Sequence, residues 1–315
     1  MQKLFSNGIE MDTNPEKFGE LIDSSAVIDD LTELRRRMHE DGYLFMRGLL
    51  DQEEVLRARH EILLKFSIIG EIDERFPLMD AIYSDRSFRE QVNLRAFSKC
   101  IRTGAAYQNV TYNKNLLDFY RRLLGGPVKP YSFQWPRLVR PGEGCGVHYD
   151  APYMNRGTTS SLYTSWIPLG DVTKQEGALI LLENSHRDEN LINSYGKKDV
   201  DKETLGWFST NPAKVRNRFG GRWLTADFRA GDVLCFGMFM MHAALDNHSP
   251  VNRCRLTSDT RYQLLSESID ERWVGEDPIA HGRDKVFFPG LGTWGNKELQ
   301  DEWKKVDAYG RLLPL

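Results

Sequence analysis

The spacing of apolar residues changes along the chain from a helical pattern to a strand pattern. From Ala26, apolar residues recur every three or four positions through Leu31, Leu34 and Met38. This period is that of an amphipathic helix with one buried face. Asp41-Gly42 provides a turn signal that ends the pattern, so we expect a helix from Ala26 to this point.

Further helices fill most of the chain up to residue 125. After a short predicted strand at 43–50, Asp51 is suited to cap a second helix whose apolar positions face a core. Residues 71–125 remain mostly helical in character, most clearly at 115–124, where Gly125-Gly126-Pro127 then stops the pattern.

Short β-rich runs separated by Gly, Pro, Asn and Asp follow from residue 131. They lie at 131–135, 137–140, 161–167, 178–182, 232–236 and 255–264, and an apolar run from Gly231-Asp232 is expected to continue as a strand ending at His242. Helices followed by many short strands predict a mainly β protein, a double-sheet jelly roll with flanking helices.

One domain of this type accommodates the whole length of 315 residues. We expect a loosely attached lead-in at 1–25, a mostly helical part at 26–127, a jelly-roll core at 128–266 and a C-terminal extension at 267–315 with a helix at 296–306. A basic insert at 187–222 interrupts the strand spacing and carries Trp207. It is either an ordinary solvated loop or a lid, since long loops in compact domains are often functional.

Composition restricts the kinds of binding partner and the cellular location that we expect for this protein. The formal net charge is −3, which gives no reason to expect a nucleic-acid surface. No apolar run has the length of a signal peptide or a membrane span, so we expect a cytoplasmic protein without a membrane partner. The four cysteines form no C-x-x-C pair, so neither a zinc site nor a disulfide framework is indicated. The sequence leaves the oligomeric state open.

His148-Tyr149-Asp150 carries the strongest chemical signal. On an extended segment, residues two positions apart point the same way, so the imidazole and the carboxylate converge. A distant histidine would complete a two-histidine, one-carboxylate triad for Fe(II) with open coordination positions. We assign this place to His242, at the end of an apolar run, in preference to His248, which lies in a polar segment before Pro250.

Taken in order, these motifs resemble the phytanoyl-CoA dioxygenase family over roughly residues 40–265. The resemblance is carried by Gly42-Tyr43, Arg47-Gly-Leu-Leu50, His148-x-Asp150, Trp166-Ile-Pro-Leu-Gly-Asp171, Glu176-Gly-Ala-Leu-Ile-Leu-Leu-Glu-Asn-Ser-His186, Gly231-Asp232, His242 and Arg255-Leu-Thr-Ser-Asp-Thr-Arg-Tyr262. It implies a double-stranded β-helix, a cupin-like jelly roll, and an oxygenase that uses Fe(II), 2-oxoglutarate and O2.

The resemblance also implies a co-substrate site. An arginine after the distal histidine would bind the far carboxylate of 2-oxoglutarate, a task suited to a fixed guanidinium. We choose Arg255 over Arg253 because Thr257, two residues later, places a hydroxyl beside the guanidinium. Trp166 matches a pocket tryptophan of the family, and Gln134 is a further candidate. Ala244 departs from the pattern, since some members have a hydroxyl residue there that contacts the co-substrate.

The expected reaction is hydroxylation of a small organic molecule, with 2-oxoglutarate decarboxylated to succinate. Candidate substrate contacts are Tyr149, Tyr153, Trp135 and Arg137. Desaturation, cyclisation and epimerisation begin with the same hydrogen abstraction and stay open. A cupin-like metal-binding, ligand-sensing protein without turnover is the alternative from another class. An arginine directed into the barrel would distinguish the enzyme from such a binder.

The identity of the carboxylate ligand predicts which atom is transferred. Chlorinating relatives have a small residue in its place, which opens a position for halide. This chain keeps Asp150 at that position. We therefore expect oxygenation without halogenation.

Overall fold

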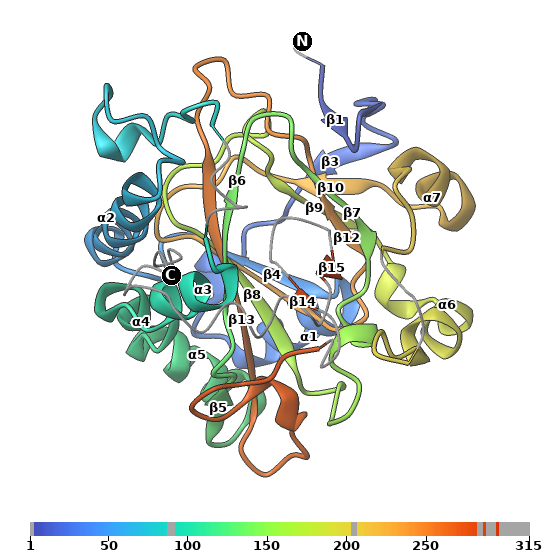
Figure 1. Ribbon diagram of the computed structural model, residues 1–315. Helices are drawn as coiled ribbons and strands as arrows, with labels where there is room; N and C mark the ends of the chain where they lie inside the picture. The colour runs from blue at the N-terminus through green and yellow to red at the C-terminus, as the bar shows by residue number, and fades with distance from the viewer. Residues whose placement is uncertain (1–2, 87–91, 203–206, 282–285, 288–293, 296–315) are drawn as a thin grey trace.

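Two β-sheets face each other and form the centre of the molecule in the computed structural model (Figure 1). The structure describes residues 3–86, 92–202, 207–281, 286–287 and 294–295. The five-stranded sheet has the order β3 (Phe18–Glu20), β10 (Trp223–Thr225), β9 (Leu179–Leu182), β12 (His242–Ala244) and β7 (Cys145–His148). The second sheet consists of β4 (Tyr43–Met46), β11 (Val233–Gly237), β8 (Tyr163–Pro168) and β13 (Arg255–Leu264), with β5 (Val128–Pro130) and β6 (Trp135–Val139) both paired to β13.

Alternation along the strands of the second sheet produces two cores. In β11, Leu234 and Phe236 pack between the two sheets, whereas Val233 and Cys235 pack against the helices. Successive side chains of a strand point to opposite faces, so both faces of this sheet are covered. The expected jelly-roll core with flanking helices is confirmed, because facing sheets and an outer helical layer are both present.

Helices cover the outer face of the second sheet. They are α1 (Leu31–Glu40), α2 (Gln52–Ile68), α3 (Leu94–Arg102), α4 (Ala105–Thr111) and α5 (Lys114–Leu124), and Figure 1 shows α2 to α5 together on one side. The Asp51 carboxylate accepts from the Glu54 amide at 2.9 Å, which confirms the predicted cap. Gly125 ends α5 with a φ of 79°, a conformation that favours glycine. The first helix begins later than expected, after a 3-10 turn at Ser25–Val27.

The other described elements are short. They are β1 (Phe5–Ser6), β2 (Ile9–Glu10), α6 (Glu189–Asn193), α7 (Pro212–Phe219), β14 (Val286–Phe287), β15 (Trp294–Gly295) and 3-10 turns at Leu78–Asp80, Ala151–Tyr153, Ser185–Arg187, Tyr195–Lys197 and Glu271–Trp273. The predicted helix at 296–306 lies outside the described residues. No helix in the described parts of the chain combines the length and the apolar character needed to cross a membrane.

Two local expectations from the sequence differ from the structure. The run from Gly231 does not continue as one strand to His242: β11 ends at Gly237, a turn follows, and His242 begins β12. The turn contains the buried residues Met238 and Met240, so the hydrophobic pattern shows no break there. The N-terminal segment is also not loosely attached. Residues of β3 pair in parallel with β10, and a β1–β2 hairpin precedes them.

Candidate metal and co-substrate site

The fold brings the three predicted metal ligands together. His148 ends β7, His242 begins β12, and the two are direct partners in the antiparallel pairing of these strands. Asp150 follows β7 and lies between them, with its Oδ1 at 3.9 Å from His148 Nε2 and 3.8 Å from His242 Nε2. One ligand atom from each residue lies within 4.8 Å of the others. This geometry can hold a single ion.

Both imidazoles are oriented by backbone carbonyls. His148 Nδ1 lies 2.8 Å from the carbonyl oxygen of Gly146, and His242 Nδ1 lies 2.9 Å from that of Met240. A carbonyl only accepts, so each Nδ1 donates its hydrogen and each Nε2 keeps a free lone pair. The tautomer required for metal binding is therefore set by the strands themselves.

The carboxylate of Asp150 is held through its other oxygen. Oδ2 accepts hydrogen bonds from Thr164 Oγ1 at 2.6 Å and from Arg261 Nη2 at 2.8 Å. Although burial alone raises the pKa of Asp150, the electrostatic contributions of the Arg261 guanidinium and of the facing His242 and His148, with the hydrogen bond from Thr164, outweigh it and hold this pKa well below its usual range. Asp150 is thus ionised, with Oδ1 directed at the histidines.

The ligand set fits a non-haem iron ion. Two imidazole nitrogens and one carboxylate oxygen on one side of an octahedral ion leave its other positions open. A cavity of about 370 Å³ adjoins these ligands. Of the predicted site residues, it is lined by His148, Asp150, His242, Arg255, Trp166 and Arg137.

Arg255 is the predicted arginine that reaches the cavity. Its guanidinium is buried and donates through Nη1 to the carbonyl of Gly177, while its Nε has no partner among the described residues. The Oγ1 of Thr257, which faces the same way two residues along β13, is also buried and unpartnered within that part of the chain. Burial lowers the pKa of Arg255 to about 10, so it is charged at neutral pH. These donors fit a carboxylate acceptor, as the distal end of 2-oxoglutarate would supply.

Arg253 occupies a different environment. It precedes β13, its Nε donates to the carbonyl of Asp80 at 3.1 Å, and its Nη1 lies 3.5 Å from Glu176. Its side chain is 37% exposed and does not line the cavity. The two arginines do not share a strand face, because the regular strand begins only at Arg255.

The remaining candidates separate into lining and packing residues. Trp166 and Arg137 line the cavity, whereas Gln134 is buried outside the lining, and its Nε2 has no hydrogen-bond partner among the residues that the structure describes. Tyr149 is fully buried and donates to the carbonyl of Ser185 at 2.5 Å, so its role here is packing.

Trp135 and Tyr153 also lie outside the lining. Trp135 stacks beneath Arg261, with the guanidinium carbon 4.4 Å from the ring centre. The ring of Tyr153 lies 6.0 Å from that of His148, where it packs on the edge of the metal site.

Sequence reasoning missed several residues at the cavity. Asp259 and Arg261 are the next two residues in the series of alternate positions of β13 that begins with Arg255 and Thr257, and both line the cavity. Asp259 accepts from Arg137 Nε at 2.5 Å. The period of two along the predicted strand carried this signal. Trp207, in the basic insert, also lines the cavity. The lysines and arginines between residues 197 and 222 do not line it; they are Lys197, Lys198, Lys202, Lys214, Arg216, Arg218 and Arg222.

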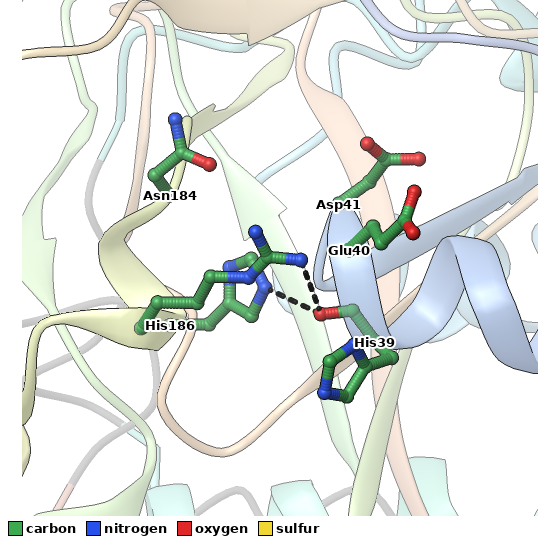
Figure 2. Close-up of a pocket in the computed structure, with 6 residues that line it drawn as sticks. His39, Glu40, Asp41, Asn184 and His186 are labelled. Carbon is green, nitrogen blue, oxygen red and sulfur yellow. Dashed lines mark hydrogen bonds between the residues drawn. The ribbon is translucent and has the colours of Figure 1, made fainter.

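A second, open cavity of about 790 Å³ lies between the end of α1 and the turn after β9. Figure 2 shows His186 directed at the backbone oxygen of His39, at 3.2 Å from its Nε2. Arg187 donates to the same oxygen at 3.0 Å. This carbonyl belongs to the last turn of α1, where no intrahelical partner is available. His186 and Arg187 therefore cap a helix, a structural role.

Comparison with known proteins identifies similar chains. The family model for phytanoyl-CoA dioxygenase (PhyH) matches residues 38–254. Two curated relatives, both called 1-deoxypentalenic acid 11-beta-hydroxylase, are 24% identical (Streptomyces exfoliatus) and 26% identical (Streptomyces arenae). Each match covers 80% of this chain and 87% of the relative.

Solved structures share the fold. The epimerase SnoN, in complex with Fe3+, alpha ketoglutarate and nogalamycin RO, is 18% identical with a TM-score of 0.54. That match covers 81% of this chain and 94% of SnoN. The carbocyclase SnoK from nogalamycin biosynthesis is 19% identical with a TM-score of 0.54, over 80% of this chain and 90% of SnoK.

Proposed function

Because the chain belongs to the phytanoyl-CoA dioxygenase family, it is an Fe(II)- and 2-oxoglutarate-dependent oxygenase, and we propose that it hydroxylates a small organic molecule. The observation that carries the proposal is the convergence of His148, Asp150 and His242 beside a cavity that contains the buried guanidinium of Arg255. A metal-binding sensor has no need of this arginine, so turnover is favoured over ligand sensing.

The residues would divide the work as follows. His148, Asp150 and His242 would hold the iron, and Arg255 with Thr257 would bind the far carboxylate of 2-oxoglutarate, with Trp166 in the pocket wall. When bound, iron, 2-oxoglutarate and O2 supply an oxidant that removes a hydrogen atom from carbon, as 2-oxoglutarate is converted to succinate. Arg137 donates a hydrogen bond from its Nε to Asp259. It is the one predicted substrate-contact residue that lines the cavity, so we propose that it binds the substrate.

Curated relatives are named as hydroxylases of a small molecule, which supports a substrate of that size for this chain. We propose that it acts in the cytoplasm, without a nucleic-acid or membrane partner. The one-domain organisation, with the segment boundaries given above, is likewise proposed.

Metal binding and turnover provide the test. Addition of Co(II) under argon is expected to raise the melting temperature, because a ligand at about 100 times its Kd stabilises the folded state by about 2.7 kcal/mol. His148→Ala is expected to abolish the rise, and His248→Ala, at an exposed histidine, to preserve it. With Fe(II), ascorbate and a metabolite extract, the protein should form succinate and a product that has gained one oxygen atom. Absence of succinate from the unmodified protein would contradict the proposal.

A further inference from the structure

The N-terminal β1–β2 hairpin reaches the cavity of the metal ligands. Its turn residues Asn7 and Gly8 both line that cavity. They have φ angles of 52° and 74°, the left-handed conformation that an Asn-Gly hairpin turn requires. The hairpin lies outside residues 38–254, which match the family model, so its presence at the cavity does not follow from the family.

Asp246 fixes this turn in place. Its Oδ1 accepts from the Asn7 amide and its Oδ2 from the Gly8 amide, both at 2.8 Å. Hydrogen bonds to a carboxylate are stronger than those between neutral groups, and Asp246 is buried, so water does not compete well for them. Asp246 also donates its own backbone amide to the carbonyl of Phe5 at 2.7 Å.

Further contacts join the hairpin to the strands that carry the histidine ligands. Ser6 Oγ donates to the carbonyl of Ala244 on β12 at 2.9 Å, and Asn7 Nδ2 lies 3.3 Å from the carbonyl oxygen of Cys145 on β7. Gly144 leaves room for the carboxylate, since a Cβ there would fall 2.1 Å from Asp246 Oδ1. Contacts from both sides thus dock the hairpin against β7 and β12.

We propose that this docked hairpin is a wall of the substrate site and restricts which molecules reach the metal ligands. The inference rests on the proposed function for what the cavity accepts. Asn7 and Gly8, held by Asp246, are then determinants of specificity, although they lie at the opposite end of the sequence from Arg255. The hairpin defines one side of the space left for the substrate.

Thiol labelling of Cys145 measures access to this cavity without metal, co-substrate or turnover. Cys145 lines the cavity and is partly buried, whereas Cys235 and Cys254 are fully buried elsewhere. Asp246→Asn keeps the side-chain size but leaves one acceptor oxygen for two amides. We expect this variant to raise the rate of N-ethylmaleimide labelling at Cys145 about tenfold, as expected for losing a charge-assisted hydrogen bond. Deletion of residues 1–11 is expected to raise it at least as much.

Glu10→Gln is the matched control in the same hairpin. It removes an exposed ion pair with Lys3 and leaves the contacts to Asp246 intact, so labelling should equal that of the parent. An unchanged Cys145 rate in the deletion variant would overturn the proposal. An equal rise in the labelling rates of the buried Cys235 and Cys254 would also overturn it, because the hairpin would then stabilise the whole fold and would not specifically close the cavity.

A second experiment compares the products that the parent and the deletion variant form. With the metabolite extract, the deletion variant is expected to oxygenate a wider set of molecules than the parent, because one wall is missing. An identical product set would overturn the specificity role. Failure of the parent to form succinate would instead contradict the proposed function, so the two failures are distinguishable.

Discussion

Arg261 donates to Asp150 Oδ2 at 2.8 Å and thereby fixes which oxygen of this carboxylate faces the two histidines. Both side chains are buried, and Trp135 supports the guanidinium from below at 4.4 Å. Thr164 binds the same oxygen. Since Oδ2 is occupied, Oδ1 is the oxygen left for a metal ion, and Asp150 is expected to bind through one oxygen only.

Loss of this contact should weaken metal binding. Arg261→Met preserves much of the side-chain volume but removes the donor, and partners of metal ligands typically contribute about 10- to 100-fold in affinity. Titration with Co(II), followed by calorimetry and by the visible ligand-field spectrum, measures the effect. Arg253→Met is the control, because Arg253 contacts neither the cavity nor Asp150. Unchanged affinity and spectrum in Arg261→Met would show that Asp150 needs no such support.

Arg255→Ala should impair co-substrate binding. Removing a buried, charge-assisted contact is expected to cost at least about 2 kcal/mol, or roughly thirtyfold in the apparent 2-oxoglutarate affinity. Arg253→Ala should change it by less than about threefold, since that half-exposed arginine pairs with Glu176. The concentration dependence of succinate formation decides between them. The opposite ranking of the two variants would assign the co-substrate to Arg253.

The grouping of the metal ligands was predictable because each one carried a local signal. The His148-x-Asp150 spacing directs two ligands to one side, and His242 follows an apolar run, although the strand boundary there was misplaced. Thr257, two residues later, led us to Arg255 over Arg253, and of these two arginines only Arg255 lines the cavity. The ligand grouping needed only the strand period and the chemistry of the side chains, whereas the expectation of a co-substrate arginine came from the resemblance to the family.

The contacts around these ligands depend on strand neighbours that are distant in sequence. Asp150 meets Thr164 on β8 and Arg261 on β13, and the sequence does not state which strands will be adjacent. The hairpin was misjudged as a loose lead-in for the same reason. Its attachment depends on Asp246, which lies 239 residues from Asn7. Long-range pairing of this kind leaves no trace in local hydrophobicity.

The basic insert at 187–222 is expected to become protected when substrate binds. Trp207 lies against Gly146, where an added Cβ would come within 2.4 Å of the indole, and Val147 exchanges backbone hydrogen bonds with Ser209 at 2.8 and 3.2 Å. The insert therefore contacts the strand that carries His148. Limited proteolysis should show slower cleavage within 187–222 in the presence of a true substrate. Cleavage at the same rate with and without substrate would favour an ordinary surface loop.

Chloride should not enter the product. As a metal ligand, the carboxylate of Asp150 would take the coordination position that a halide needs, and its negative charge would disfavour a second anion beside it. The unmodified protein is therefore expected to yield oxygenated and no chlorinated product at high chloride, as measured by mass spectrometry. Asp150→Ala should weaken Co(II) binding and substrate oxidation together, because it removes one of three ligands and leaves Arg261 without its acceptor. A chlorinated product from the unmodified protein, or full activity in Asp150→Ala, would exclude Asp150 from the metal site.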